Sequence, residues 1–266
     1  MIPISTVATR TAPTSAPRRL DGRLFTVLAV AAAAGAASIV PYQLATAPDA
    51  VAATGLTPMA FAAITIASGT MLGALASIVG LWLGPRTGLG APLLADLVRG
   101  RIDRVAWRRA LAVAVPAGAG LAAVVVAVDV ALAPFLPATT SVSAPLPARY
   151  LASLYGAINE EFLLRLGLLT AVAWVLALAT GARAPLRPAL LWTATLVAAI
   201  GFGVAHLPAV AAVVPLDGVV VARTIGLNAL LGTAFGVLYW RHGLGAAMAA
   251  HLAADLVIQT AAWALA

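Results

Sequence analysis

The most regular feature of the chain is a series of long apolar runs separated by short polar segments. Each run is long enough for a helix that crosses a bilayer, which needs about 20 mainly apolar residues. We place seven runs at residues 24–44, 56–83, 108–136, 148–179, 188–207, 219–240 and 244–265. The pattern predicts an all-α protein, a polytopic transmembrane helical bundle of about 7–8 helices.

The polar segments divide the chain simply. Residues 1–23 combine Arg with Pro, Ser and Thr, which is typical of a disordered cytoplasmic tail. Residues 24–266 then read as a single transmembrane domain. Within it, residues 88–109 mix Leu and Val with Arg and Asp, so the first part of this segment is expected to form a short helix on the cytoplasmic surface.

Arginine is concentrated in every second connection between the apolar runs. The connections between these hold few basic residues, Arg149 and Arg223. By the positive-inside rule the N-terminus lies in the cytoplasm, and seven spans put the C-terminus outside. The arginines on the cytoplasmic side, apart from those of the tail, are Arg86, Arg99, Arg101, Arg104, Arg108, Arg109, Arg183, Arg187 and Arg241.

Composition agrees with a membrane protein and excludes several function classes. Hydrophobic residues make up 62% of the 266 residues and charged residues 9%, at a net charge of +7. The basic residues are spread along the chain, which argues against a nucleic-acid partner and leaves the lipid bilayer as the expected surroundings. The absence of Cys rules out a thiolate nucleophile. A chain without Lys and rich in Ala and Arg indicates a high-GC bacterial source, hence the cell membrane.

The two glutamates of the chain, Glu160 and Glu161, stand side by side inside the fourth run. Ionisable groups at membrane depth are costly and usually mark function. At about 100° of rotation per residue, Glu161 and Arg165 share one face of an α-helix, whereas Glu160 points elsewhere. We therefore expect Glu161 to form a structural ion pair with Arg165, which leaves Glu160 free to act as a base.

Two histidines in later runs form similar pairs. Phe202 and His206 are four residues apart in "FGVAH", and His251 and Asp255 repeat that spacing in "HLAAD". Alone, a buried histidine is more often a hydrogen-bonded core residue than a catalytic one. A buried polar network that fixes helix packing gains only about 1 kcal/mol per contact, so the whole set is better explained by chemistry. Asp129 has no evident partner and is interpreted as structural.

Three motifs carry a resemblance to a known family. "EEFLLR" (160–165), "FGVAH" (202–206) and "HLAAD" (251–255) resemble, in order and spacing, the EExxxR, FxxxH and Hxxx(N/D) motifs of the CAAX protease and bacteriocin-processing (CPBP, Abi) family. The resemblance covers about residues 148–258. It implies a membrane-embedded endopeptidase similar to the type II CAAX prenyl endopeptidase.

The resemblance also implies roles for the residues. It makes Glu160 the general base, with His206 helping to hold and deprotonate the attacking water. It gives His251 the stabilisation of the oxyanion with help from Asp255, while Glu161, Arg165 and Phe202 support the site. The prenyl endopeptidase has Asn at the position of Asp255, and an ionised Asp cannot donate a hydrogen bond, so Asp255 must be protonated or orient His251.

Other interpretations remain open. The resemblance implies no cofactor, but one Glu and two His also form a known zinc set in hydrolases, so zinc is not excluded. A proton-coupled transporter would also place such residues at mid-membrane, and a non-catalytic immunity or scaffold protein would tolerate the loss of Glu160. For an enzyme, we favour a peptide or membrane-protein substrate, because prenylated CAAX proteins are not expected in bacteria.

The predicted spans put Glu160, His206 and His251 at different depths in the membrane. One water molecule cannot be shared by side chains at different depths. The site therefore requires either tilted or displaced helices, or a fifth helix (188–207) that starts deeper in the membrane and continues past Pro208.

Overall fold

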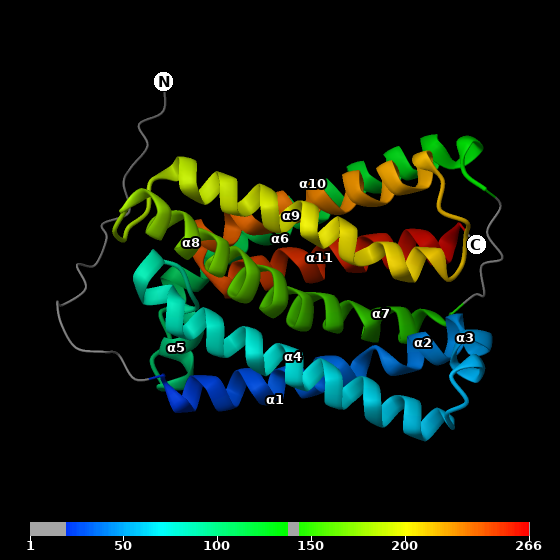
Figure 1. Cartoon of the computed structure of the whole chain (residues 1–266), viewed down its shortest axis with the longest axis horizontal. Helices are drawn as coiled ribbons and strands as arrows, with labels where there is room; N and C mark the ends of the chain where they lie inside the picture. Colours follow the sequence, from blue (N-terminus) through cyan, green and yellow to red (C-terminus); the bar gives the residue numbers. More distant parts are fainter. Residues whose placement is uncertain (1–19, 138–143, 266) are drawn as a thin grey trace.

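A computed structural model describes residues 20–137 and 144–265; residues 1–19, 138–143 and 266 lie outside the description. The described residues form a bundle of helices that run along one long axis, with no strand among them (Figure 1). Of the predicted tail, residues 1–19 are thus not described. Gly22 and Arg23, which the tail was expected to include, instead form the first turn of α1.

Seven helical stretches in the described part are long and apolar enough to cross a membrane, which confirms the predicted polytopic bundle. In chain order the elements are α1 (Gly22–Ser38), α2 (Val40–Thr46), α3 (Pro48–Ala53), α4 (Pro58–Thr87), α5 (Pro92–Val98), α6 (Arg104–Leu132), η1 (Ala133–Phe135), α7 (Leu146–Tyr155), η2 (Gly156–Glu160), η3 (Phe162–Leu169), α8 (Thr170–Thr180), α9 (Pro188–Ala211), α10 (Gly218–His242) and α11 (Leu244–Ala264). The stretches α1–α2, α6–η1 and α7–η2–η3–α8 each make one span.

The long helices begin at side chains that cap their free N–H groups. Asp21 accepts a hydrogen bond from the Leu24 amide, and Thr57, Asp103 and Asp217 cap α4, α6 and α10 in the same way. The amide of Leu24, together with Arg99, lowers the pKa of the Asp21 carboxyl. Because unpaired N–H groups are costly near lipid, these caps fix where the spans begin.

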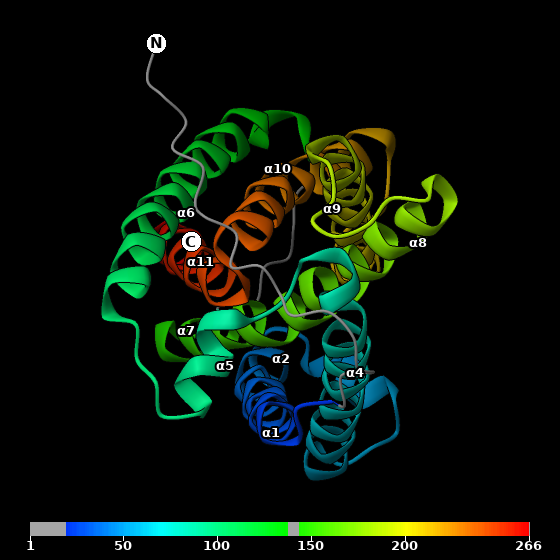
Figure 2. The same ribbon diagram turned by 90° about the vertical axis from the view of Figure 1, so that its left-hand side faces the viewer.

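The spans pack as three pairs around one central helix. The pairs α1 and α4, α6 and α11, and α9 and α10 each share long contacts, and α7–η2–η3–α8 touches a member of every pair. Seen end-on, this central helix passes obliquely between α1 and α4 on one side and the other pairs on the opposite side (Figure 2). The Glu pair therefore lies on the helix that the rest of the bundle encloses.

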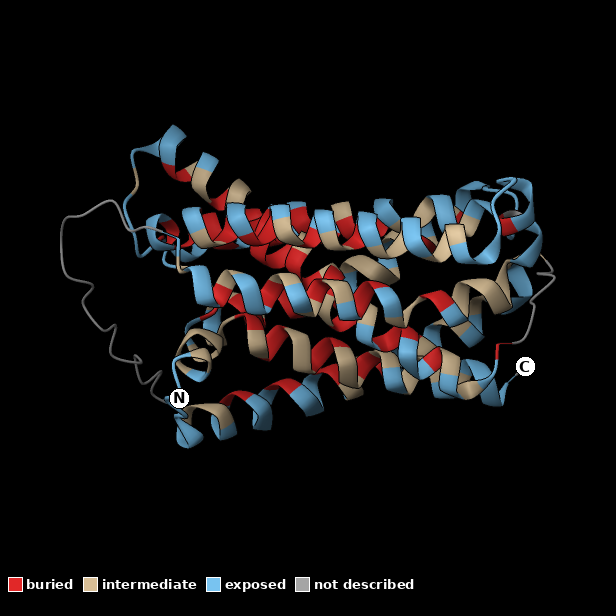
Figure 3. Cartoon of the chain, turned by 90° about the horizontal axis from the view of Figure 1, so that it is seen from below, coloured by how far each residue is buried: buried red, intermediate tan, exposed pale blue. Residues whose placement is uncertain are grey.

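Burial follows this arrangement. Buried residues line the surfaces where the spans meet, and exposed residues cover the outside of the bundle (Figure 3). Large apolar side chains such as Val30, Ile64 and Leu178 are more than half exposed. An apolar surface of this kind suits contact with lipid tails.

The Arg-rich connections gather at one end of the bundle, where α1 begins, α4 ends and α9 begins (Figure 1). The short surface helix expected within residues 88–109 is α5, and the amide of Leu244 donates to the Gly90 carbonyl beside it at 3.2 Å. Which end faces the cytoplasm stays a prediction. Asp129 does have a partner, because it forms an ion pair with Arg223 between α6 and α10.

Candidate active site

The site is built on an unusual stretch of the central helix. Residues 156–160 and 162–169 form π-helix, with hydrogen bonds from residue i to i+5, between the α-helical segments α7 and α8. The Thr170 hydroxyl donates to the Arg165 carbonyl five residues earlier and so stabilises the wider turn. The assumed rotation of 100° per residue does not hold here. Such π segments occur frequently at functional sites.

Glu161 is the most enclosed acidic residue of the site. Its side chain is fully buried, and Oε1 lies 2.9 Å from the Arg165 guanidinium, so the expected ion pair is present. Arg165 also donates to the Gly232 carbonyl at 3.1 Å. The same Glu161 oxygen lies 2.7 Å from Nδ1 of His251. Glu161 thus joins Arg165 to His251, a contact that the sequence interpretation did not predict.

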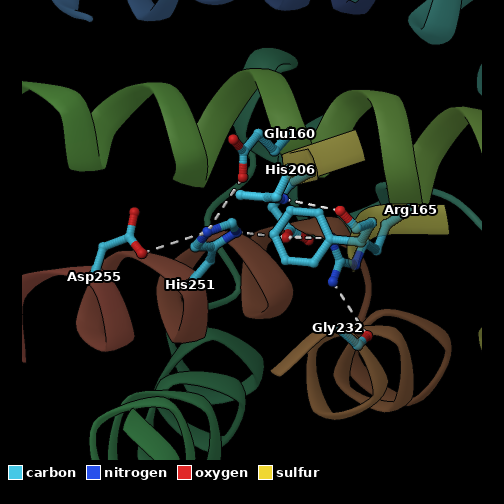
Figure 4. A network of polar contacts seen from close by, with 8 residues as sticks. Glu160, Arg165, His206, Gly232, His251 and Asp255 are labelled. Atoms are coloured by element: carbon cyan, nitrogen blue, oxygen red, sulfur yellow. Dashed lines mark hydrogen bonds and ion pairs between the residues drawn. The ribbon is translucent and has the colours of Figure 1, made fainter. Parts of the chain in front are cut away.

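The opposite ring nitrogen of His251 faces two further carboxylates. Nε2 lies 3.7 Å from Glu160 Oε2 and 3.6 Å from Asp255 Oδ1 (Figure 4). Both distances are longer than a direct hydrogen bond. The side chains of Glu160 and Asp255 each keep 22% exposure, whereas that of His251 keeps 5%. The two carboxylates therefore border the open side of the cluster, and His251 is its enclosed centre.

His206 joins the cluster through Phe202. Its Nδ1 lies 2.8 Å from the Phe202 carbonyl oxygen, and its ring packs edge-on against the Phe202 ring with centroids 4.6 Å apart. A carbonyl only accepts, so Nδ1 carries the proton, and Nε2 of the neutral ring keeps its lone pair. Figure 4 shows His206 on the side of the cluster where Glu160 lies.

Helix length and tilt bring these residues together. α9 continues through Pro208 to Ala211, which is one alternative of the depth argument, and the central helix runs obliquely, which is the other (Figure 2). Contacts within 4 Å then join His251 to Glu160, Glu161 and Asp255. His206 makes no hydrogen bond or ion pair with them among the described residues.

Aromatic rings enclose the charged groups. Phe235 stacks on His251 with centroids 4.6 Å apart, and Phe202 meets the same ring edge-on at 5.9 Å. The Arg165 guanidinium lies 5.1 Å from the Phe202 ring and 5.3 Å from that of Phe235. These rings exclude water and attract the cation through their faces. Phe202 was expected to support the site; Phe235 was missed, because one Phe in an apolar run carries no distinguishing signal.

Asn159 is a second residue that the sequence interpretation missed. It is buried, and its amide nitrogen donates to the carbonyl oxygens of Ala32 in α1 and Gly69 in α4, at 3.1 and 3.2 Å. The residue directly before the Glu pair therefore anchors the central helix to the N-terminal pair. An amide at membrane depth next to Glu160 was the signal available in the sequence.

Two features of the structure bear on the zinc alternative, namely the grouping of possible metal ligands and the charge of Arg165. Among the described residues, no three His, Cys, Asp or Glu side chains are grouped so that they could hold a metal ion. The buried Arg165 charge beside Glu161 also opposes a second cation at this position.

A comparison with family models gives one match. Residues 142–257 match the family described as "Type II CAAX prenyl endopeptidase Rce1-like". The match supports the assignment of this segment to the CAAX protease family. No curated protein and no solved structure matches the chain.

The matched segment runs from α7 to α11 and contains every residue of the cluster. The similarity to this family supports, in general terms, a membrane-embedded endopeptidase. The spans before it, α1 to α6, lie outside the match. Of these spans, α1 and α4 nevertheless contact the central helix, through Asn159 among others.

Proposed function

We propose that the chain is an intramembrane endopeptidase that hydrolyses a peptide bond with a water molecule activated by Glu160 and His206. The observation that carries this proposal is the His251 ring, bound to the buried Glu161 through Nδ1 at 2.7 Å and facing Glu160 and Asp255 through Nε2. Such an arrangement sets a fixed donor beside a free carboxylate. Those are the two elements that hydrolysis by activated water needs.

Glu160 suits the role of general base. Its carboxylate makes no hydrogen bond with another described side chain, and it borders the open side of the cluster. In the neutral ring of His206, Nε2 is free to accept a hydrogen bond from the second O–H of the same water molecule and so helps to hold it. Glu160 takes a proton while the water oxygen attacks the carbonyl carbon of the substrate, and it later returns this proton to the leaving amine.

His251 and Asp255 stabilise the negative oxygen that this attack creates. With Nδ1–H held by Glu161, a protonated ring directs its second N–H, on Nε2, toward the open side. Asp255 lies 3.6 Å from the same Nε2, so its carboxyl group borders the same space. In its protonated form this carboxyl donates to the oxyanion, as Asn would.

The charges of the cluster favour this assignment of protons. Three carboxyl groups, Glu160, Glu161 and Asp255, lie around His251, with one guanidinium, that of Arg165. A neutral cluster results when His251 carries a second proton and one of the three carboxyls is also protonated. Net charge is costly in a low dielectric, so this state is favoured. Of the three carboxyl groups, we assign this proton to Asp255, because its proposed role as a donor to the oxyanion requires one.

Glu161 positions the ring of His251. Its carboxylate accepts from Nδ1–H, which fixes the tautomer and the ring orientation as a second carboxylate commonly does for a catalytic His. Arg165 holds Glu161 from the other side at 2.9 Å. Glu161 therefore does more than neutralise Arg165, because it also orients the ring of His251.

The substrate that we propose is a peptide or a segment of a membrane protein. A composition without Lys and rich in Ala and Arg supports a bacterial source, where prenylated CAAX proteins are not expected. The test compares membrane-associated peptides from cells that carry the wild type or Glu160→Gln. We expect specific peptides to be cleaved in wild-type cells alone. Identical peptide sets at equal protein levels would overturn the proposed function.

A further inference from the structure

Gly156 begins the π-helical stretch, four residues before Glu160, and it is buried. It faces α11 at the position of the two residues expected to stabilise the oxyanion. A Cβ atom at residue 156 would lie 2.6 Å from Asp255 Oδ2 and 3.0 Å from His251 Nε2. A Cβ atom essentially never comes within 3.0 Å of such an atom, so a side chain at this position would displace the Asp255 carboxyl or crowd the His251 ring.

Several other glycines also allow close packing, but against atoms of other kinds. Gly118 and Gly203 face the backbones of Ala250 and Ile225, and Gly80 faces Leu166. Those positions let helices approach one another, as small residues do in membrane bundles. Of the 23 glycines, Gly156 is the one whose added Cβ would meet ionisable side chains.

We propose that Gly156 is a positioning residue of the catalytic cluster, and this inference rests on the proposed function. Its missing side chain leaves the space in which the Asp255 carboxyl and Nε2 of His251 lie within reach of Glu160. Gly156 lies on the same stretch of helix as Glu160, so the spacing between base and oxyanion donors depends on this position.

A methyl group at residue 156 acts on the site more than on the fold. Ala has the higher helix propensity, so the backbone itself tolerates the change. The nearest atom that the methyl group meets, Asp255 Oδ2, is the end of a flexible side chain that can rotate away. The substitution therefore moves the Asp255 carboxyl, while the helices remain packed. Loss of catalysis without loss of stability is the expected signature.

The test measures peptide cleavage and thermal unfolding of the full chain in detergent for Gly156→Ala. We expect kcat to fall by about 10–100-fold with KM little changed, because displacement of catalytic groups by as little as 1 Å has effects of this size. Gly120→Ala and Gly226→Ala are matched controls in α6 and α10, since no atom lies within 4 Å of an added Cβ there. Both should retain activity within about threefold of the wild type.

A double variant separates positioning from general damage. Asp255→Ala removes the group that the methyl would displace, so Gly156→Ala should reduce kcat much less in the Asp255→Ala background than in the wild type. The inference is overturned if Gly156→Ala keeps wild-type kcat, if KM alone changes, or if the two effects multiply. The proposed function fails in a different way, because Glu160→Gln would then cleave as well as the wild type.

Discussion

Glu161→Gln tests how the buried acid couples the two cationic groups of the site. The Glu161 side chain has no exposure and that of Arg165 has 1%, so the loss of the carboxylate charge strands a guanidinium inside the bundle. Breaking one partner of a buried pair costs about 3–5 kcal/mol. The change also weakens the 2.7 Å hydrogen bond to His251, and a charge-assisted bond is worth about 1.5–3 kcal/mol. These terms share one carboxylate oxygen and do not simply add.

The assay is thermal unfolding in detergent, with Glu160→Gln as the matched control. By the scaling of soluble domains of similar size, about 3–5 kcal/mol lowers the melting temperature by roughly 6–20 °C. Glu160 retains 22% exposure and has no close cation other than His251 at 3.7 Å, so its variant should melt near the wild type. Equal melting temperatures for the two variants would refute the distinction between a buried anchor and a free base.

Two further predictions concern protonation and metal. Asp255→Asn keeps a hydrogen-bond donor that does not titrate, whereas the wild type loses its donor as Asp255 ionises at higher pH. The variant should therefore be active and should stay active to a higher pH than the wild type, which a pH–rate profile measures. An inactive Asn variant would show that the carboxylate form is needed. A chelator should leave the rate of cleavage unchanged, because the Arg165 guanidinium beside Glu161 opposes the binding of a metal ion. Activity that is lost with the chelator and returns with added zinc would favour the zinc alternative.

The spans could be predicted closely because each is a property of local composition. The predicted run at 219–240 became α10 (Gly218–His242), and the run at 244–265 became α11 (Leu244–Ala264). Boundaries shifted where a side chain outside the run caps the helix, as Asp21 does for α1. The predicted run at 188–207 was too short, because α9 continues through Pro208 to Ala211, as one alternative of the depth argument allowed. Packing against α10 accompanies this continuation, and a single run does not reveal such a partner.

The candidate site was only partly predictable from the sequence. Glu161 and Arg165 could be paired because they are four residues apart on one helix. The contact between Glu161 and His251 joins residues 90 positions apart. It depends on how α11 crosses a π-helical stretch, and the apolar pattern of the sequence does not predict that stretch. Gly156 was missed for the same reason, since its importance lies in what approaches it across the bundle.

The most direct measurement of the central claim is cleavage of a peptide substrate by purified wild type and Glu160→Gln, each in detergent and at matched folded concentration. Gln keeps the shape of Glu but cannot accept the proton of the attacking water. We predict that kcat falls by about 10²–10⁴-fold, the contribution typical of a general base, while the melting temperature stays near that of the wild type. A Glu160→Gln variant that cleaves at the wild-type rate would contradict the assignment of Glu160 as the catalytic base.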